Sequence, residues 1–263
     1  MNDAETSRPL LCHVEDGIAT LTLNRPAQRN AINLELMEAM LDALEDIGTD
    51  PDIKVVVLSA QGPAFCAGHD LKEMRADPGE DAQAKTFATC AAMMMAIIHL
   101  PQPVIARVHG IATAAGCQLV ATCDLAVASE DARFATPGVH IGLFCSTPMV
   151  ALSRNVGRKQ AMEMLLTGEM IDAKRAQALG LINRAVPAGD LDAAVEELAG
   201  KICAKSPLAV RIGKEAFYHQ LETSLEAAYE YTGAVMVRNM MAGDAAEGID
   251  AFLEKRRPEW KGR

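Results

Sequence analysis

The pattern of hydrophobic and polar positions predicts a hairpin and then a helix at the start of the chain. Alternating residues at 10–15 and 18–24 flank the pair Asp16-Gly17, a dipeptide that favours a tight turn between antiparallel strands. A helical repeat of apolar positions follows, and Asn33 stands where the N-cap of that helix is expected. We therefore expect two paired strands and then a helix.

Three later runs are apolar without alternation, which is typical of strands buried on both faces of a sheet. They cover 54–60, 104–108 and 124–129, and helical patterns separate them. Strands that alternate with helices at this spacing favour parallel pairing through right-handed crossovers. The sequence therefore predicts an α/β core.

From about residue 146 the pattern is almost entirely helical, with one short strand at 181–186. We predict an α/β core domain over 1–200 and an all-helical C-terminal region over 201–263, without a long linker between them. The predicted helices span 147–156, 158–167, 172–179, 189–204, 207–220, 223–241 and 244–256.

Composition and charge exclude several classes of partner. The chain has 263 residues, half of them apolar, and a net charge of −10. Nucleic acid and anionic membrane surfaces need a basic footprint, so we predict neither as a partner. The most apolar helical run ends before Pro101 and is shorter than the ~20 residues that span a bilayer, so no membrane insertion is expected.

The cellular compartment is predicted from the cysteines and from the N-terminal residues. Seven cysteines are scattered through apolar segments without a C-x-x-C pair, which favours neither a disulfide framework nor a metal site. Residues 1–17 are short and acidic and match neither a signal peptide nor a transit peptide. We therefore predict a reduced, cytoplasmic protein.

Two loops rich in glycine and alanine share a design. "GPAFCAGHD" (62–70) and "HGIATAAGCQ" (109–118) each follow a predicted strand and open a helix. Helix starts present unpaired N–H groups, and two such groups aimed at one point would bind a carbonyl oxygen that becomes negative during a reaction. For either loop taken alone, turn geometry and close packing are the favoured explanation, because glycine-rich turns are common.

Four segments taken together resemble the enoyl-CoA hydratase/isomerase, or crotonase, superfamily. They are "AFCAGHDLKEM" (64–74), "HGIATAAGCQLVATCDLAVASE" (109–130), "FATPGVHIGL" (134–143) and "RKQAMEMLLTGEMIDAKRAQALGLINRAVP" (158–187). The resemblance runs in the same order from "LTLNRPAQRNAI" to "AFLEKRRPEW", which is nearly the whole chain. It points to a subgroup of the enoyl-CoA hydratase domain-containing type, which lacks both hydratase glutamates.

The resemblance implies a fold, an assembly and a ligand. The fold is a crotonase-type spiral of ββα units, and the C-terminal helices pack on the core and on neighbouring subunits of a homotrimer or of a hexamer made from two trimers. The ligand is a coenzyme A thioester bound without a prosthetic group or metal. The backbone N–H groups of His69 and Ala115 correspond to the oxyanion hole.

The resemblance also implies which residues contact coenzyme A. Local cations would let an acidic protein bind the polyanionic nucleotide. The expected contacts come from the backbone near the adenine, from the pantetheine path, and from C-terminal positions that would close over a neighbouring subunit's site. These residues are Arg25, Arg29, Cys66, Ala67, His69, Asp70, Leu71, Lys72, Phe252 and Lys255.

The chain departs from the family at the two catalytic glutamates. Gln118 stands where the first is expected, and Gly138, after Pro137, stands where the second is expected. A general base must accept a proton, which neither an amide nor a hydrogen atom does near neutral pH. The standard two-glutamate hydration mechanism is therefore not expected here.

Other residues near these positions have two interpretations each. In an extended segment His140 would share the face of Gly138 and reach the thioester as a neutral base, or else it is a packing residue. The ring of His69 is either an acid or a wall of the pocket. Ser146 stands where some relatives carry an aspartate, and Cys117 and Cys145 are more typical of buried packing than of nucleophiles.

Two functions follow from these observations. The first is an enzyme of acyl-CoA or fatty-acid metabolism, a lyase or isomerase on CoA thioesters that uses the oxyanion hole and an unconventional residue, His140 being the leading candidate. The second is a crotonase-fold protein that binds acyl-CoA for sequestration or regulation without turnover.

Overall fold

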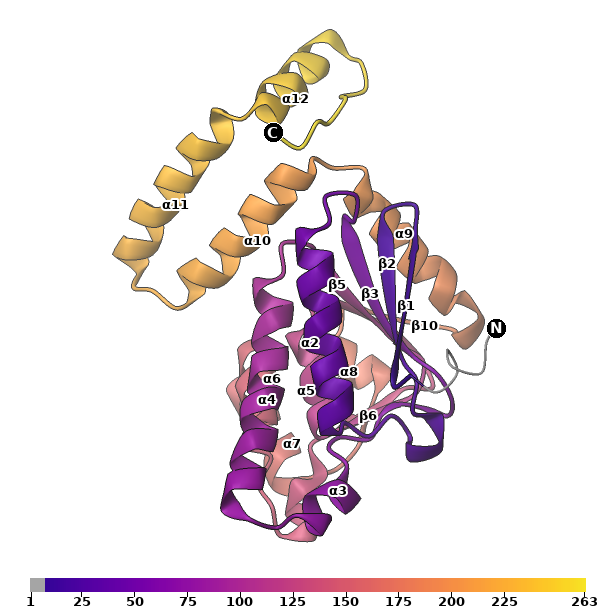
Figure 1. The fold of residues 1–263 in the computed structure, drawn as a ribbon. Helices are drawn as coiled ribbons and strands as arrows, with labels where there is room; N and C mark the ends of the chain where they lie inside the picture. Colours follow the sequence, from indigo (N-terminus) through magenta and orange to yellow (C-terminus); the bar gives the residue numbers. More distant parts are fainter. Residues whose placement is uncertain (1–7) are drawn as a thin grey trace.

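The computed structural model describes residues 8–263, which form two β-sheets surrounded by helices (Figure 1). The strands are β1 (Leu10–Glu15), β2 (Ile18–Leu23), β3 (Val55–Ala60), β4 (Ala64–Cys66), β5 (Val104–Val108), β6 (Ile111–Thr113), β7 (Leu125–Ser129), β8 (Arg133–Ala135), β9 (Ile171–Asp172) and β10 (Arg184–Val186). The α-helices are α2 (Leu34–Thr49), α3 (Leu71–Ala76), α4 (Glu80–His99), α5 (Ala115–Thr122), α6 (Pro148–Asn155), α7 (Arg158–Thr167), α8 (Ala173–Leu179), α9 (Leu191–Cys203), α10 (Pro207–Leu221), α11 (Leu225–Met240) and α12 (Gly243–Glu254). Three short 3-10 helices are η1 (Pro26–Gln28), η2 (Pro137–Ile141) and η3 (Ala188–Asp190).

The larger sheet confirms the predicted hairpin and the parallel core. Its order is β1-β2-β3-β5-β7-β10, with β1 antiparallel to β2 and every later pair parallel. Asp16 and Gly17 both have positive φ, 50° and 77°, as the turns that suit a twisted hairpin require. The Asn33 side chain accepts a hydrogen bond from the Leu36 N–H and caps α2, as predicted.

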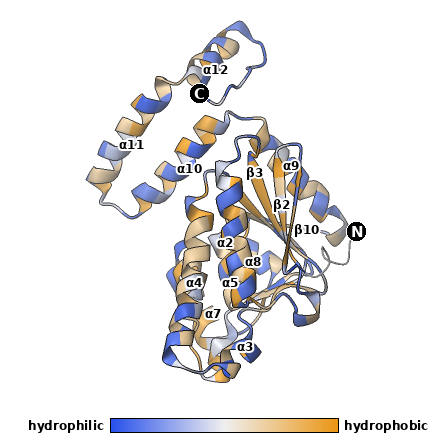
Figure 2. Ribbon diagram, in the orientation of Figure 1, coloured by the Kyte–Doolittle hydropathy of each residue, from blue (hydrophilic) through white to orange (hydrophobic). Residues whose placement is uncertain are grey.

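Both faces of the central strands are buried, which explains their unbroken apolar runs. In β3, Val56 and Leu58 belong to the main core with α2 and α4, whereas Val55 and Val57 pack with α9 on the other face. Figure 2 shows β2 and β3 as hydrophobic strands between more mixed helices. Successive side chains of a strand point to opposite faces of the sheet, so β3 contributes to two separate apolar layers.

The smaller sheet has the order β4-β6-β8-β9, and no local pattern in the sequence predicted its strands. Its first three strands are only three residues long, and such short strands carry no readable alternation. Two of them, β4 and β6, lie inside the segments that were predicted to be loops. Each follows a strand of the larger sheet, and a helix comes next, so the chain repeats a ββα unit. This repeat is the crotonase-type spiral. The strands β4, β6 and β8 run parallel, so their carboxyl ends lie side by side.

The C-terminal helices α10, α11 and α12 extend away from the sheets (Figure 1). The predicted boundary at residue 200 falls inside α9, which packs on the larger sheet. The division into domains 1–200 and 201–263 stays a prediction. Figure 2 shows hydrophobic and hydrophilic positions intermixed on these helices.

One buried lysine fastens α10 to the core. The Lys214 ammonium donates hydrogen bonds to the carbonyls of Ile97 (2.9 Å) and Gln102 (3.0 Å) and to the Asp124 carboxylate (2.7 Å). The Tyr218 hydroxyl donates to the other oxygen of Asp124 at 2.9 Å. Burial lowers the pKa of Lys214, and the carboxylate of Asp124 opposes that shift. Helix α10 is therefore held by a charged contact closed off from water.

Two further observations bear on the sequence predictions. Within residues 8–263, no helix is long and apolar enough to cross a membrane. Over the same range, no group of three His, Cys, Asp or Glu side chains is arranged to hold a metal ion. The prediction made on residues 1–17 falls partly on residues 1–7, which lie outside the described residues.

Candidate functional site

The two glycine- and alanine-rich loops meet because they leave neighbouring parallel strands. One follows β4, the other follows β6, and residue 136 opens a third loop after β8. The Thr113 hydroxyl donates to the Ala67 carbonyl at 3.1 Å and joins the first two loops. Gly116 allows direct contact, since a Cβ there would lie 2.2 Å from the Cys66 carbonyl oxygen. The start of α5 thus rests on the end of β4.

The N–H of Ala115 is a free donor at the start of α5. Its neighbours are paired: the Ala114 N–H donates to the Ala135 carbonyl at 2.9 Å, and the Gln118 N–H donates to the Ala114 carbonyl at 3.0 Å. As the first residue of the helix, Ala115 has no intrahelical acceptor. Nothing between residues 8 and 263 accepts a hydrogen bond from this N–H.

The N–H of His69 is a second free donor in the adjacent loop. The Ile32 N–H donates to the Gly68 carbonyl at 2.7 Å, and the Asp70 N–H donates to the Ile32 carbonyl at 2.8 Å, so the pairing skips His69. A Cβ on Gly68 would lie 3.5 Å from the Ala115 nitrogen, which shows how closely the loops approach. Two unpaired amides from separate loops therefore stand at one edge of the small sheet.

The backbone of the second loop is strained at Ala114, directly before α5. This residue has φ 51° and ψ −118°, a conformation that residues with a Cβ rarely adopt. Such strain costs about 1–3 kcal/mol and persists only where the surroundings impose it. Here the bond from the Ala114 N–H to Ala135 fixes the peptide, and the turn at Ala114 orients the following N–H, that of Ala115.

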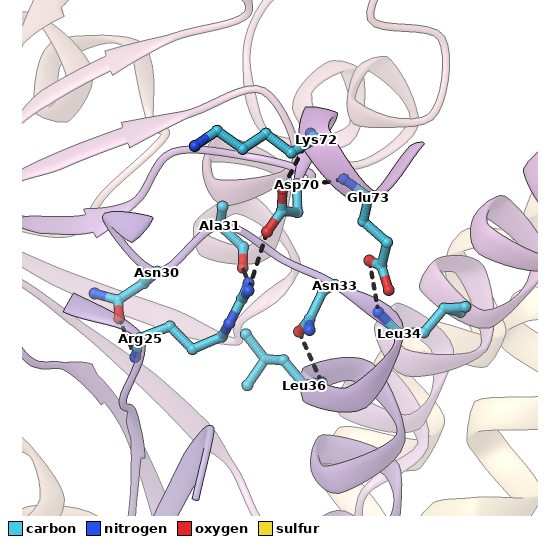
Figure 3. Close-up of polar contacts among 9 residues, drawn as sticks. All are labelled: Arg25, Asn30, Ala31, Asn33, Leu34, Leu36, Asp70, Lys72 and Glu73. Carbon is cyan, nitrogen blue, oxygen red and sulfur yellow. Dashed lines mark hydrogen bonds and ion pairs between the residues drawn. The ribbon is translucent and has the colours of Figure 1, made fainter. Parts of the chain in front are cut away.

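A mostly buried ion pair holds the first loop in place (Figure 3). The Arg25 guanidinium lies 3.0 Å from the Asp70 carboxylate and also donates to the Ala31 carbonyl. The other oxygen of Asp70 accepts from the N–H groups of Lys72 (3.1 Å) and Glu73 (3.4 Å) and caps α3. Burial pushes the pKa of Asp70 upward, but these hydrogen bonds, above all that from Arg25, hold it below its usual range. Arg25 is thus a structural partner of Asp70.

Most of the other predicted contact residues in and around the first loop are exposed. Figure 3 shows the Lys72 side chain extending away from Asp70. The side chains of Arg29 and Lys72 have no partner in the part of the chain that the structure describes. Leu71 is also exposed, whereas Cys66 is buried and Ala67 lies at the surface. The two cations are therefore free to meet an anionic ligand.

The predicted C-terminal contacts do not join this site within one chain. Phe252 is 82 % exposed, and Lys255 follows the end of α12 with φ 58°. In Figure 1, α12 lies at the opposite end of the molecule from α3. A contact of these residues with a nucleotide would need the site of another subunit.

Gln118 and Thr136 are buried, uncharged polar residues on the segments that follow β6 and β8. Gln118 lies on α5 three residues after Ala115, and Thr136 follows the last residue of β8. They are 5 % and 0 % exposed, and neither the Gln118 Oε1 nor the Thr136 Oγ1 atom has a hydrogen-bond partner within the described residues. Thr136 was not among the residues predicted for the site; its place before the Pro137-Gly138 pair was the available signal.

Gly138 has no room for the glutamate that the family carries. A Cβ at this position would lie 2.8 Å from the Leu143 carbonyl oxygen and 2.9 Å from the Cys145 Sγ. The Gly138 N–H donates to that sulfur at 3.3 Å. Burial raises the pKa of Cys145, an effect that this N–H opposes. The thiol and the glycine therefore fit each other, and the sequence alone did not reveal the pairing.

The substitution Gly138→Glu is expected to destabilise the protein by about 1–3 kcal/mol, because the added atoms overpack a closed segment. Gly189→Glu is the control, since a Cβ at Gly189 meets nothing within 4 Å. Urea unfolding of both variants measures the difference. Equal stability of the two variants would show that residues 143–145 move aside freely.

His140 does not have the geometry that the sequence analysis assumed. It lies in η2, a 3-10 helix, and not in an extended segment, so the argument that it shares a face with Gly138 is wrong. Its ring is exposed, and its Nε2 lies 2.9 Å from the Thr167 carbonyl oxygen at the end of α7. The contact supports the packing interpretation. Ser146 is likewise exposed.

His69 is the titratable side chain that lies beside the donor pair. Its ring packs edge-to-face on Phe87, with centroids 5.5 Å apart. Its Nε2 is buried and has no partner within residues 8–263. Burial lowers the pKa of His69, which favours the neutral form of the ring. By contrast, burial raises the pKa of the Cys117 thiol to about 12, which leaves it unreactive.

Comparison with known proteins gives a consistent family. The family model described as enoyl-CoA hydratase/isomerase matches residues 13–263. Enoyl-CoA hydratase domain-containing protein 3, mitochondrial, from Homo sapiens is 48% identical over 254 residues, which cover 96% of this chain and 84% of that protein. The crystal structure of an enoyl-CoA hydratase from Mycobacterium smegmatis aligns with a TM-score of 0.94 and 57% identity, covering 96% of this chain and 98% of that one.

The same comparison corrects the predicted compartment. The human relative and its counterpart from Xenopus laevis, 48% identical over 94% of this chain and 84% of that protein, are both named as mitochondrial. The cytoplasmic prediction is therefore contradicted. It rested on two observations. Scattered free cysteines indicate a reducing environment but do not distinguish between reducing compartments. Residues 1–17 were predicted to match no transit peptide, and the mitochondrial relatives speak against the compartment inferred from that.

Proposed function

The chain belongs to the enoyl-CoA hydratase/isomerase family, and we propose that it binds acyl-CoA thioesters and polarises their carbonyl group with the N–H groups of His69 and Ala115. The observation that carries this proposal is the pair of unpaired amides at the adjoining ends of β4 and β6. Preorganised donors of this kind stabilise the negative charge that develops on a thioester oxygen.

The nucleotide end of the ligand would lie along the first loop. Arg29 and Lys72 are the exposed cations available to its phosphates, and the backbone at Cys66 and Ala67 would face the adenine. Arg25 contributes indirectly, because its bond to Asp70 fixes the loop that carries these groups. An acidic protein needs only such local cations to bind a polyanion.

Assembly into a homotrimer or hexamer is part of the proposal. Its support is the amount of apolar side chain left exposed on the C-terminal helices, since contiguous apolar patches mark interaction sites. In an assembly, Phe252 and Lys255 would reach a neighbouring subunit's site. The exposed residues are Phe217, Leu221, Leu225, Tyr229, Met236, Val237, Met240, Met241, Ile249, Phe252 and Leu253.

Hydration by two carboxylates is not part of the proposed function. Gln118 has an amide, and Gly138 is closed off by Cys145 and the Leu143 carbonyl. A positioned acid or base typically contributes 10²–10⁴-fold in rate, so losing both removes most of that mechanism. The protein on this proposal binds and polarises the thioester.

A second candidate function keeps a catalytic step and assigns it to His69. Burial favours its neutral form, and its buried Nε2 has no hydrogen-bond partner among residues 8–263. A neutral imidazole accepts a proton near physiological pH, which an isomerisation or an enolisation requires. This observation favours His69 over His140 as the acid or base of an enzyme.

The proposed function is tested by comparing two ligands that differ at the carbonyl. Butyryl-CoA is expected to bind about 100-fold more tightly than S-butyl-CoA, a thioether without the carbonyl oxygen, because two hydrogen bonds are worth about 10-fold each. Isothermal titration calorimetry gives both dissociation constants, and infrared difference spectra are expected to show a weakened carbonyl bond. Equal affinities for the two ligands would sink the proposal.

The variant His69→Ala separates the two candidate functions, because it keeps the backbone N–H and removes the ring. Binding is expected to survive in this variant. Wild-type protein and variant are both incubated with 2-enoyl-, 3-enoyl- and 3-hydroxyacyl-CoAs. Turnover that the variant loses would establish the enzyme, and no turnover by either would leave the binding function.

A further inference from the structure

The uncharged polar groups of the site indicate which acyl groups it accepts. Three loops follow the parallel strands β4, β6 and β8, and their carboxyl ends lie in one row. The first two provide the donor pair. Thr136, from the third, is placed next to Ala114, because the Ala114 N–H bonds to Ala135. Gln118 lies one helical turn beyond Ala114, in the helix that begins at Ala115, so both residues belong to segments that adjoin the Ala115 N–H.

Gln118 and Thr136 would lower the stability of a pocket that held only hydrocarbon, because their buried polar atoms would stay without hydrogen bonds. The Gln118 Oε1 and Thr136 Oγ1 atoms are both shielded from water and unpartnered within the described residues, so they are not bonded to each other. Buried polar groups are nearly always hydrogen-bonded, and leaving one unpaired opposes folding. A ligand that brings a donor or acceptor to these atoms recovers the loss, and one that brings only methylene groups does not.

The three loops that follow β4, β6 and β8 also lack a positively charged side chain that would bind a carboxylate. Residues 67–69, 114–118 and 136–138 contain no arginine or lysine. Arg25, the mostly buried cation that holds the first loop, is already bonded to Asp70 and to the Ala31 carbonyl. A carboxylate buried here without a cation would lose its hydration with no compensation.

Resting on the proposed function, we propose that the site selects acyl-CoA thioesters whose acyl group carries an uncharged hydrogen-bonding substituent close to the thioester, and that Gln118 and Thr136 recognise that substituent. Acyl groups made only of hydrocarbon bind less tightly, and those with a carboxylate bind least. Both residues act as specificity determinants, while the donor pair at His69 and Ala115 holds the carbonyl in every case.

Three ligands with four-carbon acyl groups test this selection. Butyryl-CoA has a hydrocarbon chain, 3-hydroxybutyryl-CoA adds a hydroxyl, and succinyl-CoA adds a carboxylate. We expect the hydroxylated thioester to bind the wild-type protein about 10-fold more tightly than butyryl-CoA, the value of one recovered hydrogen bond. Succinyl-CoA is expected to bind at least about 10-fold more weakly than butyryl-CoA. Calorimetric titrations measure all three.

Apolar replacements of similar shape identify the recognising residues. In Gln118→Met and in Thr136→Val, the ratio of the dissociation constant of butyryl-CoA to that of 3-hydroxybutyryl-CoA is expected to fall from about 10 toward one. Butyryl-CoA itself is expected to bind as tightly as before or more tightly. Thr122→Val is the control, because this buried threonine on the same helix already donates its hydroxyl to the Gln118 carbonyl at 2.8 Å. Circular dichroism confirms folding, and either variant alone decides the result if the other fails to fold.

The outcomes separate this inference from the proposed function. Equal binding of butyryl-CoA and 3-hydroxybutyryl-CoA by the wild-type protein would overturn the selection and leave thioester binding intact. An equal loss of affinity for both ligands in Gln118→Met and Thr136→Val would do the same, since it indicates a structural role. Failure of all three thioesters to bind would overturn the proposed function and the selection with it.

Discussion

Replacing Gly116 with alanine is expected to weaken acyl-CoA binding by about 10- to 100-fold, because the first turn of α5 must move away from β4 and one or both hydrogen bonds to the carbonyl are lost. The new Cβ would lie 2.2 Å from the Cys66 carbonyl oxygen and 2.8 Å from the carbonyl carbon. Both are backbone atoms, so no side-chain rotation relieves the clash. The displacement separates the Ala115 N–H from the His69 N–H, and two donors that no longer converge do not share one oxygen.

The same change is expected to lower the free energy of unfolding by about 3 kcal/mol, the upper part of the range for overpacked cores. Gly200→Ala is the matched control, since Gly200 is also helical and a Cβ there meets nothing within 4 Å. Alanine favours helix over glycine, so the control is expected to be slightly stabilised and to bind normally. Calorimetric titration with butyryl-CoA and urea unfolding measure the two effects. Normal binding by Gly116→Ala would contradict the assignment of the donor pair.

Lys214→Met is expected to destabilise the protein by about 3–5 kcal/mol, because it leaves the buried Asp124 carboxylate without its cation. The ammonium also serves the carbonyls of Ile97 and Gln102, which would lose that donor. Lys214 joins α10 to the core, so the loss is expected to release the C-terminal helices first. Hydrogen exchange of α10 amides follows that release, and urea unfolding gives the total.

The control for Lys214→Met is Lys201→Met. Lys201 also pairs with a carboxylate, that of Glu197 one turn away, but its side chain is 59% exposed. Exposed ion pairs contribute at most about 1 kcal/mol, so this variant is expected to unfold nearly as the wild type does. If both lysine variants lose the same stability, burial of the Asp124 pair is not what holds α10.

The sequence predicted the parts of the fold in which one periodicity extends over many residues. The hairpin at Asp16-Gly17, the capped helix after Asn33 and the doubly buried strand at 55–60 all follow from local patterns. The strands β4, β6 and β8 could not be read, because three residues hold no period and their pairing joins distant segments. The smaller sheet is therefore a property of the tertiary structure, with no local signal.

The candidate site divides in the same way. The free amides of His69 and Ala115 were predicted through family resemblance, and the pairing of their neighbours supports them. The role of Arg25 was less accessible, since an arginine in a loop reads equally as a ligand contact or as the partner of Asp70. His140 failed because its argument assumed an extended backbone. The Pro137-Gly138 pair instead begins a 3-10 helix, in which residues two apart do not share a face.

The row formed by β4, β6 and β8 has a consequence for how the protein acquires its function. Each pair in the row joins residues far apart in sequence, such as Ala64 with Ile111, and such non-local pairs form slowly because they close long loops. Either loop could form its own turn early, but the two amides converge only after the row has assembled. A partly folded intermediate with intact helices would therefore have no donor pair, so the kinetics of ligand binding during refolding report on the formation of this small sheet.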